Sequence, residues 1–241
     1  METTKQMEIQ RYIDYSTLKP EMTVDEVKGA LERAIEDNYK AICVRPCDIE
    51  MAVAMCKGTD TVSCCVLDYP HGTGGKEAKK ALTEIYAKQG IEEIDMVMNF
   101  GLARSGLWDS VGEEITAVTR AAHDNGAIVK VIFEIGHLTL DQIGKATEVC
   151  IECDADFVKT CTGFYEPVTE EAVKMMLDTA AGRTKVKASG PGIFDLATAE
   201  KYIDLGVERL GIGSAFSDKI LAESRGINVS EMDKSISKGE Y

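Results

Sequence analysis

The segments Asp-Phe-Val-Lys-Thr (156–160) and Lys-Val-Lys-Ala-Ser-Gly (185–190) each carry a lysine at the end of a short apolar run. Such runs are typical of buried strands, and each is followed by a small, polar segment that contains glycine. Lysine is almost never fully buried unless it has a partner or a function. If the two strands are consecutive, Lys159 and Lys187 lie at matching strand ends, and their positive charges are close together.

The proximity of these two ammonium groups predicts a type of chemistry. Burial and a neighbouring like charge both lower the pKa of an ammonium group. A lysine with a lowered pKa presents a neutral amine, which attacks a carbonyl carbon and forms a Schiff base. We therefore predict a lowered pKa at this lysine pair and Schiff-base chemistry.

Short β-rich runs alternate with longer amphipathic stretches along the chain. Eight candidate strands lie near 12–15, 40–45, 62–67, 93–98, 128–134, 156–160, 185–189 and 208–212. Helical patterns lie between them at 23–38, 75–89, 109–125, 139–153, 168–181 and 195–206, the first opening with the capping box Thr23-Val-Asp-Glu. Eight such strand–helix units in 241 residues predict a single-domain (β/α)8 TIM barrel, an α/β fold. The alternative is an open, doubly wound sheet.

In such a barrel the reacting groups lie at the C-terminal ends of the strands. Besides the two lysines, the predicted strand ends carry Asp14, Cys43, Asp68, Asp95 and Glu134. Asp95 is flanked by apolar residues, so a place in the barrel interior is natural for it. A carboxylate near two lysines can hold one as an ammonium and exchange protons through the other or through water. By contrast, we place Lys130 and Lys185 at the rim, where their ammonium groups reach water.

The composition argues against several kinds of partner. The chain has 241 residues, a net charge of −14 and 44% hydrophobic residues, which fit one sizeable globular domain. Negative charge disfavours nucleic acid, whose phosphates must be neutralised by lysine and arginine, and it disfavours an anionic membrane. The sequence shows neither a run long enough to cross a bilayer nor an apolar signal core at its start, so we expect a cytoplasmic protein.

The cysteines and the missing cofactor motifs predict a protein without a metal or cofactor. Cys150 and Cys153, like Cys43 and Cys47, lack the compact four-ligand spacing of a zinc site, so we expect reduced, mostly buried thiols. A Gly-x-Gly-x-x-Gly or Walker A pattern does not follow an early strand. His71 and His137 follow predicted strands and are candidate substrate contacts.

Several segments resemble the deoxyribose-phosphate aldolase family. Asp-Phe-Val-Lys-Thr-Cys-Thr-Gly-Phe (156–164) is similar to the Schiff-base segment of that family. Further similar stretches follow the family's order, at 13–19, 41–44, 93–99, 130–134 and 186–190. The resemblance covers about residues 10–222. It implies a metal-free class I aldolase that reversibly joins acetaldehyde to glyceraldehyde 3-phosphate on a (β/α)8 barrel, and a homodimer.

The resemblance also implies roles for individual residues. Lys159 forms the imine, Lys187 lowers the pKa of Lys159, and Asp95 joins a proton relay with Lys187 and a water. Thr17 and Thr162 line the site. The loops after the seventh and eighth strands bind phosphate through backbone N–H groups, for which the candidates are Gly190, Gly192, Gly213 and Ser214.

Departures from the family pattern affect the expected substrate. The segment Ser-Gly-Pro-Gly-Ile-Phe (189–194) inserts Pro191 and places Phe194 where a basic residue is common. Gly213 replaces a serine after the eighth strand, and Asp-Tyr-Pro (68–70) replaces Gly-Phe-Pro. We therefore predict weakened phosphate selectivity. Two alternatives stay open: an aldolase of the same family with a different or unphosphorylated acceptor, and a catalytically silent barrel that binds a sugar phosphate.

The end of the chain is expected to differ from the barrel. Residues 223–241 are polar and weakly periodic, which predicts a flexible tail after a barrel of residues 1–222. Some members of the family end in a tyrosine that reaches the active site. Tyr241 stands in that position, where a phenol can relay a proton. The alternative is that this tyrosine is incidental.

Overall fold

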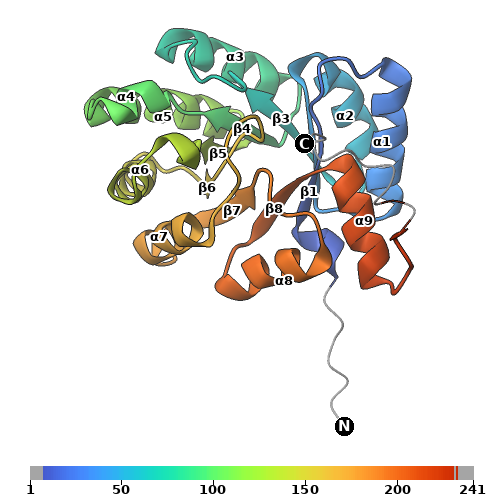
Figure 1. Cartoon of the computed structure of the whole chain (residues 1–241). Helices are drawn as coiled ribbons and strands as arrows, with labels where there is room; N and C mark the ends of the chain where they lie inside the picture. The colour runs from blue at the N-terminus through green and yellow to red at the C-terminus, as the bar shows by residue number, and fades with distance from the viewer. Residues whose placement is uncertain (1–7, 231, 233–241) are drawn as a thin grey trace.

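The protein, described by a computed structural model over residues 8–230 and 232, forms a closed barrel of eight parallel strands (Figure 1). Each strand pairs with the next, and the last pairs with the first. This confirms the predicted fold and rules out the open sheet. The strands are β1 (Ile13–Thr17), β2 (Ala41–Val44), β3 (Val62–Leu67), β4 (Glu93–Val97), β5 (Ile128–Ile132), β6 (Phe157–Lys159), β7 (Lys185–Ser189) and β8 (Arg209–Gly213).

Helices surround the barrel (Figure 1). The α-helices are α1 (Val24–Glu36), α2 (Ile49–Cys56), α3 (Lys76–Lys88), α4 (Phe100–Arg104), α5 (Trp108–His123), α6 (Leu140–Glu152), α7 (Glu170–Ala180), α8 (Leu196–Leu205) and α9 (Ser214–Ser224). Short 3-10 helices are η1 (Ile9–Tyr12), η2 (Pro46–Asp48) and η3 (Ile135–His137). Six α-helices match the predicted stretches. The sequence analysis missed α2, α4 and α9, because α2 is nearly all apolar, α4 has only five residues, and α9 buries polar side chains.

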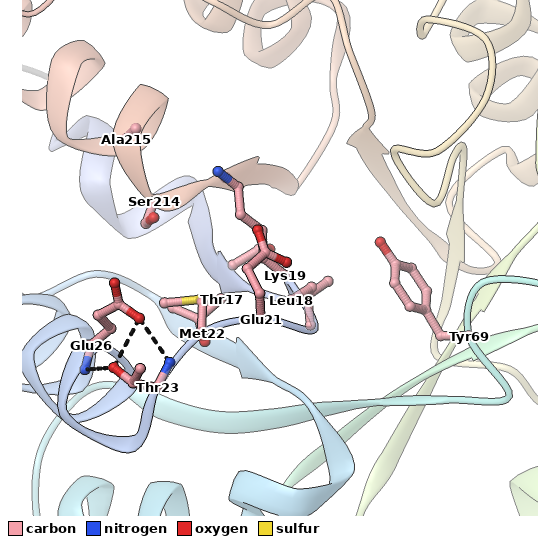
Figure 2. A pocket seen from close by; sticks show the side chains of 12 residues that line it. Thr17, Leu18, Lys19, Glu21, Met22, Thr23, Glu26, Tyr69, Ser214 and Ala215 are labelled. Carbon is pink, nitrogen blue, oxygen red and sulfur yellow. Dashed lines mark hydrogen bonds between the residues drawn. The ribbon is translucent and has the colours of Figure 1, made fainter. Parts of the chain in front are cut away.

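The predicted capping box at the start of α1 is confirmed. Glu26 accepts a hydrogen bond at 2.7 Å from the backbone N–H of Thr23, and the Thr23 hydroxyl accepts one at 3.3 Å from the N–H of Glu26 (Figure 2). A second capping box, formed by Thr139 and Gln142, opens α6. Such reciprocal bonds satisfy backbone donors that the first helical turn leaves open. They fix the points where the loops after β1 and η3 end.

The apolar core lies between the sheet and the helices, and charged side chains occupy the barrel interior. Alternate residues of a strand face opposite sides of the sheet. On β5, Val129 and Val131 join the apolar core, whereas Lys130 between them makes ion pairs inside the barrel. On β4, Ile94 joins the core while Asp95 faces inward in the same way. The interior is therefore a polar site.

Of the remaining sequence predictions, some are confirmed by the structure and others are not tested by it. All eight cysteines are free thiols, and six of them are buried, as expected. Over the part of the chain that the structure describes, no helix has the length and apolarity to cross a membrane. The domain boundary at residue 222 stays a prediction. Tyr241 lies outside the described residues.

Candidate active site

A cluster of buried charged side chains fills the barrel interior. The register of neighbouring strands brings these side chains together. Asp95 on β4 is opposite Lys130 on β5. Lys187 on β7 is opposite Lys159 on β6 and opposite Arg209 on β8. We call this group of seven side chains the charge cluster. Its four cations and three anions are Lys130, Lys159, Lys187, Arg209, Asp14, Glu93 and Asp95.

Asp95 is the centre of the charge cluster. Its Oδ2 accepts hydrogen bonds from Lys159 Nζ at 2.7 Å and from Lys187 Nζ at 2.8 Å. Its Oδ1 accepts one from Lys130 Nζ at 2.7 Å and contacts Cys64 Sγ at 3.3 Å. Asp95 is fully buried, so these charge-assisted bonds replace the water that the carboxylate has lost. Both oxygens are therefore fully engaged.

The three lysines differ in how many carboxylates hold them. Lys130 pairs with Asp95, with Glu93 at 2.6 Å and with Asp14 at 3.4 Å. Lys187 pairs with Asp95 and with Asp14 at 2.5 Å. Lys159 pairs with Asp95 alone. Arg209 contacts the remaining oxygens of Asp14 and Glu93. The ammonium group of Lys159 is therefore the most weakly held.

The pKa directions in this cluster correct one prediction. Burial alone would raise the pKa of Asp95, but Lys130, Lys159 and Lys187 outweigh it and hold that pKa well below its ordinary value. Burial alone would lower the pKa of Lys159, but the charge of Asp95, its hydrogen bond to Lys159 and the nearby thiols together outweigh burial, so the pKa is raised. The prediction of a lowered pKa is wrong for Lys159 in this resting contact. It considered the like charges and missed the strength of the carboxylate at 2.7 Å.

The structure also revises the set of interior residues. Placing Lys130 at the rim is wrong, because its side chain is 0% exposed. Its charge stays buried because three carboxylates surround it. Lys185 is exposed as expected, with Nζ 5.3 Å from the centre of the Phe157 ring. Sequence reasoning missed Glu93 and Arg209. Glu93 lies two residues before Asp95, and this spacing could have placed it on the same face.

Gly211 on β8 provides space for the lysines. A Cβ atom at this position would lie 2.9 Å from Lys187 Cε and 2.7 Å from Ser189 Cβ. Lys159 Cε would be at 3.7 Å. Only glycine therefore lets both lysine side chains pass this strand without displacing a neighbour.

Cys43 and Cys64 border the charge cluster. Their Sγ atoms lie 3.6 Å apart on paired residues of β2 and β3. Together with Asp95 they place three ligand-type atoms within 4.8 Å of one another. The Asp95 oxygens already bind three lysines, however, and those positive charges disfavour a metal cation. The expectation of no metal stays a prediction.

A cavity of about 390 Å³ opens between the ends of β1 and β8 and the start of α9 (Figure 2). Three predicted substrate-binding residues line it: Thr17, Gly213 and Ser214. Lys19 also lines it, and Tyr69 bounds it from the side of β3 (Figure 2). The first four N–H groups of a helix lack intrahelical partners, so the wall formed by α9 can bind an anion.

The other predicted binding residues lie elsewhere. Gly190 and Gly192 have φ angles of 112°. A Cβ atom at Gly190 would lie 2.7 Å from Cys161 Cβ, and one at Gly192 would lie 3.6 Å from Val168. Their surroundings thus differ from those of Gly213 and Ser214. The ring of Phe194 packs against Phe216 of α9, with centroids 4.7 Å apart, where the family pattern has a basic side chain.

The segment after β6 covers the barrel mouth. The Tyr69 hydroxyl donates a hydrogen bond at 2.6 Å to the Thr162 carbonyl, and the Tyr69 ring meets Phe164 edge-on. Thr162 is 2% exposed, and its hydroxyl binds Glu134. The Lys159 side chain itself is 4% exposed. Some part of the barrel mouth must therefore move before a substrate reaches Lys159.

The two candidate histidines belong to an aromatic group at the same mouth. His137 stacks on Phe100 at 5.1 Å and meets the Tyr165 ring at 4.9 Å. His71 Nδ1 lies 3.2 Å from the Tyr165 hydroxyl. Both histidines thus contact the segment that covers the mouth.

A closed (β/α)8 barrel with paired interior lysines around a carboxylate is the arrangement of a class I aldolase, which acts as a lyase through a lysine. The comparisons agree. Residues 9–200 match the DeoC/LacD family aldolase profile, so the chain belongs to that family. It is 39% identical over 220 residues to a deoxyribose-phosphate aldolase from Clostridium tetani, covering 91% of this chain and 100% of the relative.

Other relatives give the same result. A deoxyribose-phosphate aldolase from Exiguobacterium sp. is 38% identical over 213 residues, covering 88% of this chain and 95% of the relative. Among solved structures, the aldolase QR15 superposes with a TM-score of 0.84 at 35% identity, covering 90% of this chain and 96% of that one. The family resemblance inferred from the sequence is therefore confirmed.

Proposed function

We propose that this aldolase reversibly cleaves 2-deoxy-D-ribose 5-phosphate to acetaldehyde and D-glyceraldehyde 3-phosphate through an imine on Lys159. The observation that carries the proposal is the shared contact of Lys159 and Lys187 with one oxygen of Asp95. The names of the relatives support the substrate. The lysine pair supports the imine.

The charge balance favours Lys159 as the nucleophile. Four cations face three anions, so loss of one proton makes the charge cluster neutral, and an uncompensated buried charge is costly. Lys159 has one carboxylate partner, whereas Lys187 has two and Lys130 three. The proton is therefore removed at least cost from Lys159. When its side chain leaves Asp95 to meet a carbonyl, burial and the charge of Lys187 favour the neutral amine.

Imine formation turns the donor aldehyde into an electron sink. A proton then leaves the α-carbon, and the resulting enamine attacks the acceptor aldehyde. We assign the transfer of this α-proton to Lys187, which first gives its own proton to the hydroxyl group that leaves the carbinolamine as water. The neutral amine of Lys187 then takes the α-proton and becomes an ammonium group again, held in place by Asp95. The contacts that hold the lysines are needed because lysine side chains are otherwise too flexible to meet one carbon atom.

The cavity between β1, β8 and α9 is the candidate site for the acceptor and its phosphate. We assign Thr17 to the acceptor and the N–H groups of Gly213 and Ser214 to the phosphate, in the cavity at the start of α9. Gly190 and Gly192 stay candidates from the preceding loop. Lys19 lines the cavity, but so do Glu21 and Glu26. This mixed charge, together with Phe194, supports weak phosphate selectivity and keeps an unphosphorylated acceptor as the second candidate.

Borohydride reduction in the presence of acetaldehyde tests the proposal. It should attach two carbons to the peptide that carries Lys159. Labelling at Lys187 with Lys159 untouched would overturn the assignment, and absence of any mass gain would favour the silent barrel. Lys159→Met serves as the control and should remain unlabelled.

Three further assignments are part of the proposal. The free thiols support a reducing, cytoplasmic location. The family resemblance supports a homodimer, which light scattering would test. We also assign a proton relay to Tyr241, so deletion of this residue should slow α-proton exchange of the acetaldehyde imine in deuterated water. An unchanged exchange rate would remove the tail from the mechanism.

A further inference from the structure

Glu134 is a buried carboxyl group for which the proposed function gives no role. It follows β5, it is 0% exposed, and its φ angle of 56° lies in the left-handed region that residues other than glycine seldom adopt. Among the residues the structure describes, its Oε1 is the single buried side-chain oxygen or nitrogen without a hydrogen-bond partner. Such atoms are rare because they are costly, and backbone outliers concentrate at functional sites.

Glu134 lies next to Lys159. The N–H of Phe133 donates to the Lys159 carbonyl at 2.9 Å, and the N–H of Ile135 donates to the Thr160 carbonyl at 3.2 Å. Glu134 is therefore held on the neighbouring strand at the level of the Lys159–Thr160 peptide. Its carboxyl group is also close enough to Lys159 and His137 for their charges to act on its pKa. Both facts place the carboxyl group near Lys159.

The segment that follows Lys159 binds Glu134. Glu134 Oε2 accepts a hydrogen bond at 3.0 Å from the N–H of Thr162 and another from the Thr162 hydroxyl. Thr162 is in turn bridged to Tyr69. Thr162 follows Lys159 by three residues, so a movement of this segment would change the surroundings of Lys159 and Glu134 together.

The other carboxyl groups near Lys159 have no oxygen to offer. Both oxygens of Asp95 bind lysines. Asp14 and Glu93 use both of their oxygens on Arg209 and on lysines. Within the described part of the chain, Glu134 alone combines a position beside Lys159 with a buried oxygen that lacks a hydrogen-bond partner.

We propose that Glu134 is a catalytic residue that takes the proton from the β-hydroxyl group of the substrate during cleavage and returns it to the aldehyde oxygen during synthesis. The proposal rests on the imine at Lys159. In cleavage, Oε1 accepts the hydroxyl proton, and the O–H electron pair becomes the second bond of the new carbonyl. The bond between the α- and β-carbons breaks, and its electron pair moves into the imine to form the enamine. Synthesis reverses each transfer, so no other reagent is consumed.

The pKa directions of Glu134 and Asp95 agree with the different roles proposed for them. Burial raises the pKa of Glu134 above its ordinary value, against the opposing effects of Thr162, His137 and Lys159. The pKa of Asp95 is held well below its ordinary value by the lysines around it. A group exchanges protons best when its pKa is near the working pH. Of these two carboxyls, Glu134 is the better proton carrier.

Two reactions measured on the same variant test the proposal. Glu134→Gln keeps the size of the side chain and an oxygen for Thr162 but cannot carry the proton. Cleavage of 2-deoxyribose 5-phosphate should slow by about 10²–10⁴-fold. Borohydride trapping of acetaldehyde and deuterium exchange at its α-carbon should stay within about twofold, because acetaldehyde has no β-hydroxyl group and neither reaction breaks a carbon–carbon bond. Equal losses in cleavage and exchange would assign Glu134 a structural role and overturn the proposal.

Thr162→Val is the matched control. It removes the hydroxyl that binds Glu134 Oε2 and leaves Oε1 unchanged. Glu134→Gln keeps an accepting oxygen for Thr162, so if Glu134 only anchors the covering segment, Thr162→Val should lose at least as much cleavage as Glu134→Gln. That result would also overturn the proposal. If wild-type protein shows no borohydride trapping, the imine itself fails, which separates this outcome from a failure of Glu134 alone. Melting temperatures of both variants establish that the barrel is folded.

Discussion

Lys159 and Lys187 lie directly opposite each other on β6 and β7, and both ammonium groups contact the same oxygen of Asp95, at 2.7 and 2.8 Å. Two like charges on one oxygen are stable only while the carboxylate stays ionised. The arrangement therefore couples the protonation states of three groups. A proton lost by one lysine strengthens the hold of Asp95 on the other.

Removing the charge of Lys187 should abolish most activity without unfolding the barrel. Lys187→Met leaves three cations against three anions in the charge cluster, so the buried charge stays balanced. We expect cleavage to slow by about 10²–10⁴-fold, the usual worth of a positioned proton carrier. The control is Lys185→Met, two residues earlier on the same strand and exposed, which should keep normal activity. Near-normal turnover of Lys187→Met would refute the assigned role.

Asp95→Asn should harm both activity and stability. It leaves four cations against two anions, and breaking a buried ion pair costs about 3–5 kcal/mol. Urea unfolding measures the stability loss, and a cleavage assay on the folded fraction should show a loss of about 10²–10⁴-fold. A variant as stable and active as wild type would show that Asp95 does not organise the lysines.

Gly211→Ala should disrupt the site through sterics alone. The added methyl group would lie 2.7 Å from Ser189 Cβ and 2.9 Å from Lys187 Cε, so the strand or the lysine must shift. We expect a lower melting temperature and a large loss of borohydride trapping. Gly29→Ala in α1 is the control, because no atom lies within 4 Å of the added carbon. It should stabilise the protein by about 0.5–1 kcal/mol, since glycine is unfavourable inside a helix.

Much of the fold and part of the site could be predicted from local sequence. The alternation of β-rich and amphipathic stretches predicts eight strand–helix units. Lys159 and Lys187 can be recognised as charged residues at the ends of apolar runs. Glu93, Arg209 and the interior position of Lys130 could not be recognised in this way. Their charges are compensated by strands that are distant in the chain, as in the pair of Arg209 and Asp14. A local window contains one partner of such a pair and not the other.

The pKa of Lys159 illustrates the same limit. Sequence reasoning takes into account burial and a nearby like charge, and both lower the pKa of a lysine. The sign of the shift, however, depends on a carboxylate that arrives from β4 at 2.7 Å. Electrostatic energy varies inversely with distance, so the closest contact outweighs the more distant charges.

Phosphate selectivity should rise when Phe194, whose ring packs on Phe216 of α9, is replaced by a cationic residue. Phe194→Arg should raise the ratio of kcat/KM for 2-deoxyribose 5-phosphate over 2-deoxyribose by about tenfold or more, because a charge-assisted hydrogen bond is worth about 1.5–3 kcal/mol. Phe194→Leu loses the contact with Phe216 without adding charge and should leave the ratio unchanged. If the ratio for Phe194→Arg is no higher than the wild-type ratio, Phe194 is not the cause of the weak selectivity.

The ionisation of Glu134 should make stability depend on pH in an unusual direction. Burial raises its pKa from 4.5, so ionisation is less favourable in the folded protein than in the unfolded chain. Stability contributed by the neutral carboxyl is then lost as pH rises from the unfolded value through the folded one. Relative to Glu134→Gln, wild type should become progressively less stable over this window, as measured by urea unfolding at pH values on both sides of it.

Glu26→Gln is the control with the opposite expected sign. Hydrogen bonds from Thr23 lower the pKa of Glu26, so wild type should gain stability over that variant as pH rises. A difference between wild type and Glu134→Gln that does not change with pH would show that burial does not raise the pKa of this carboxyl.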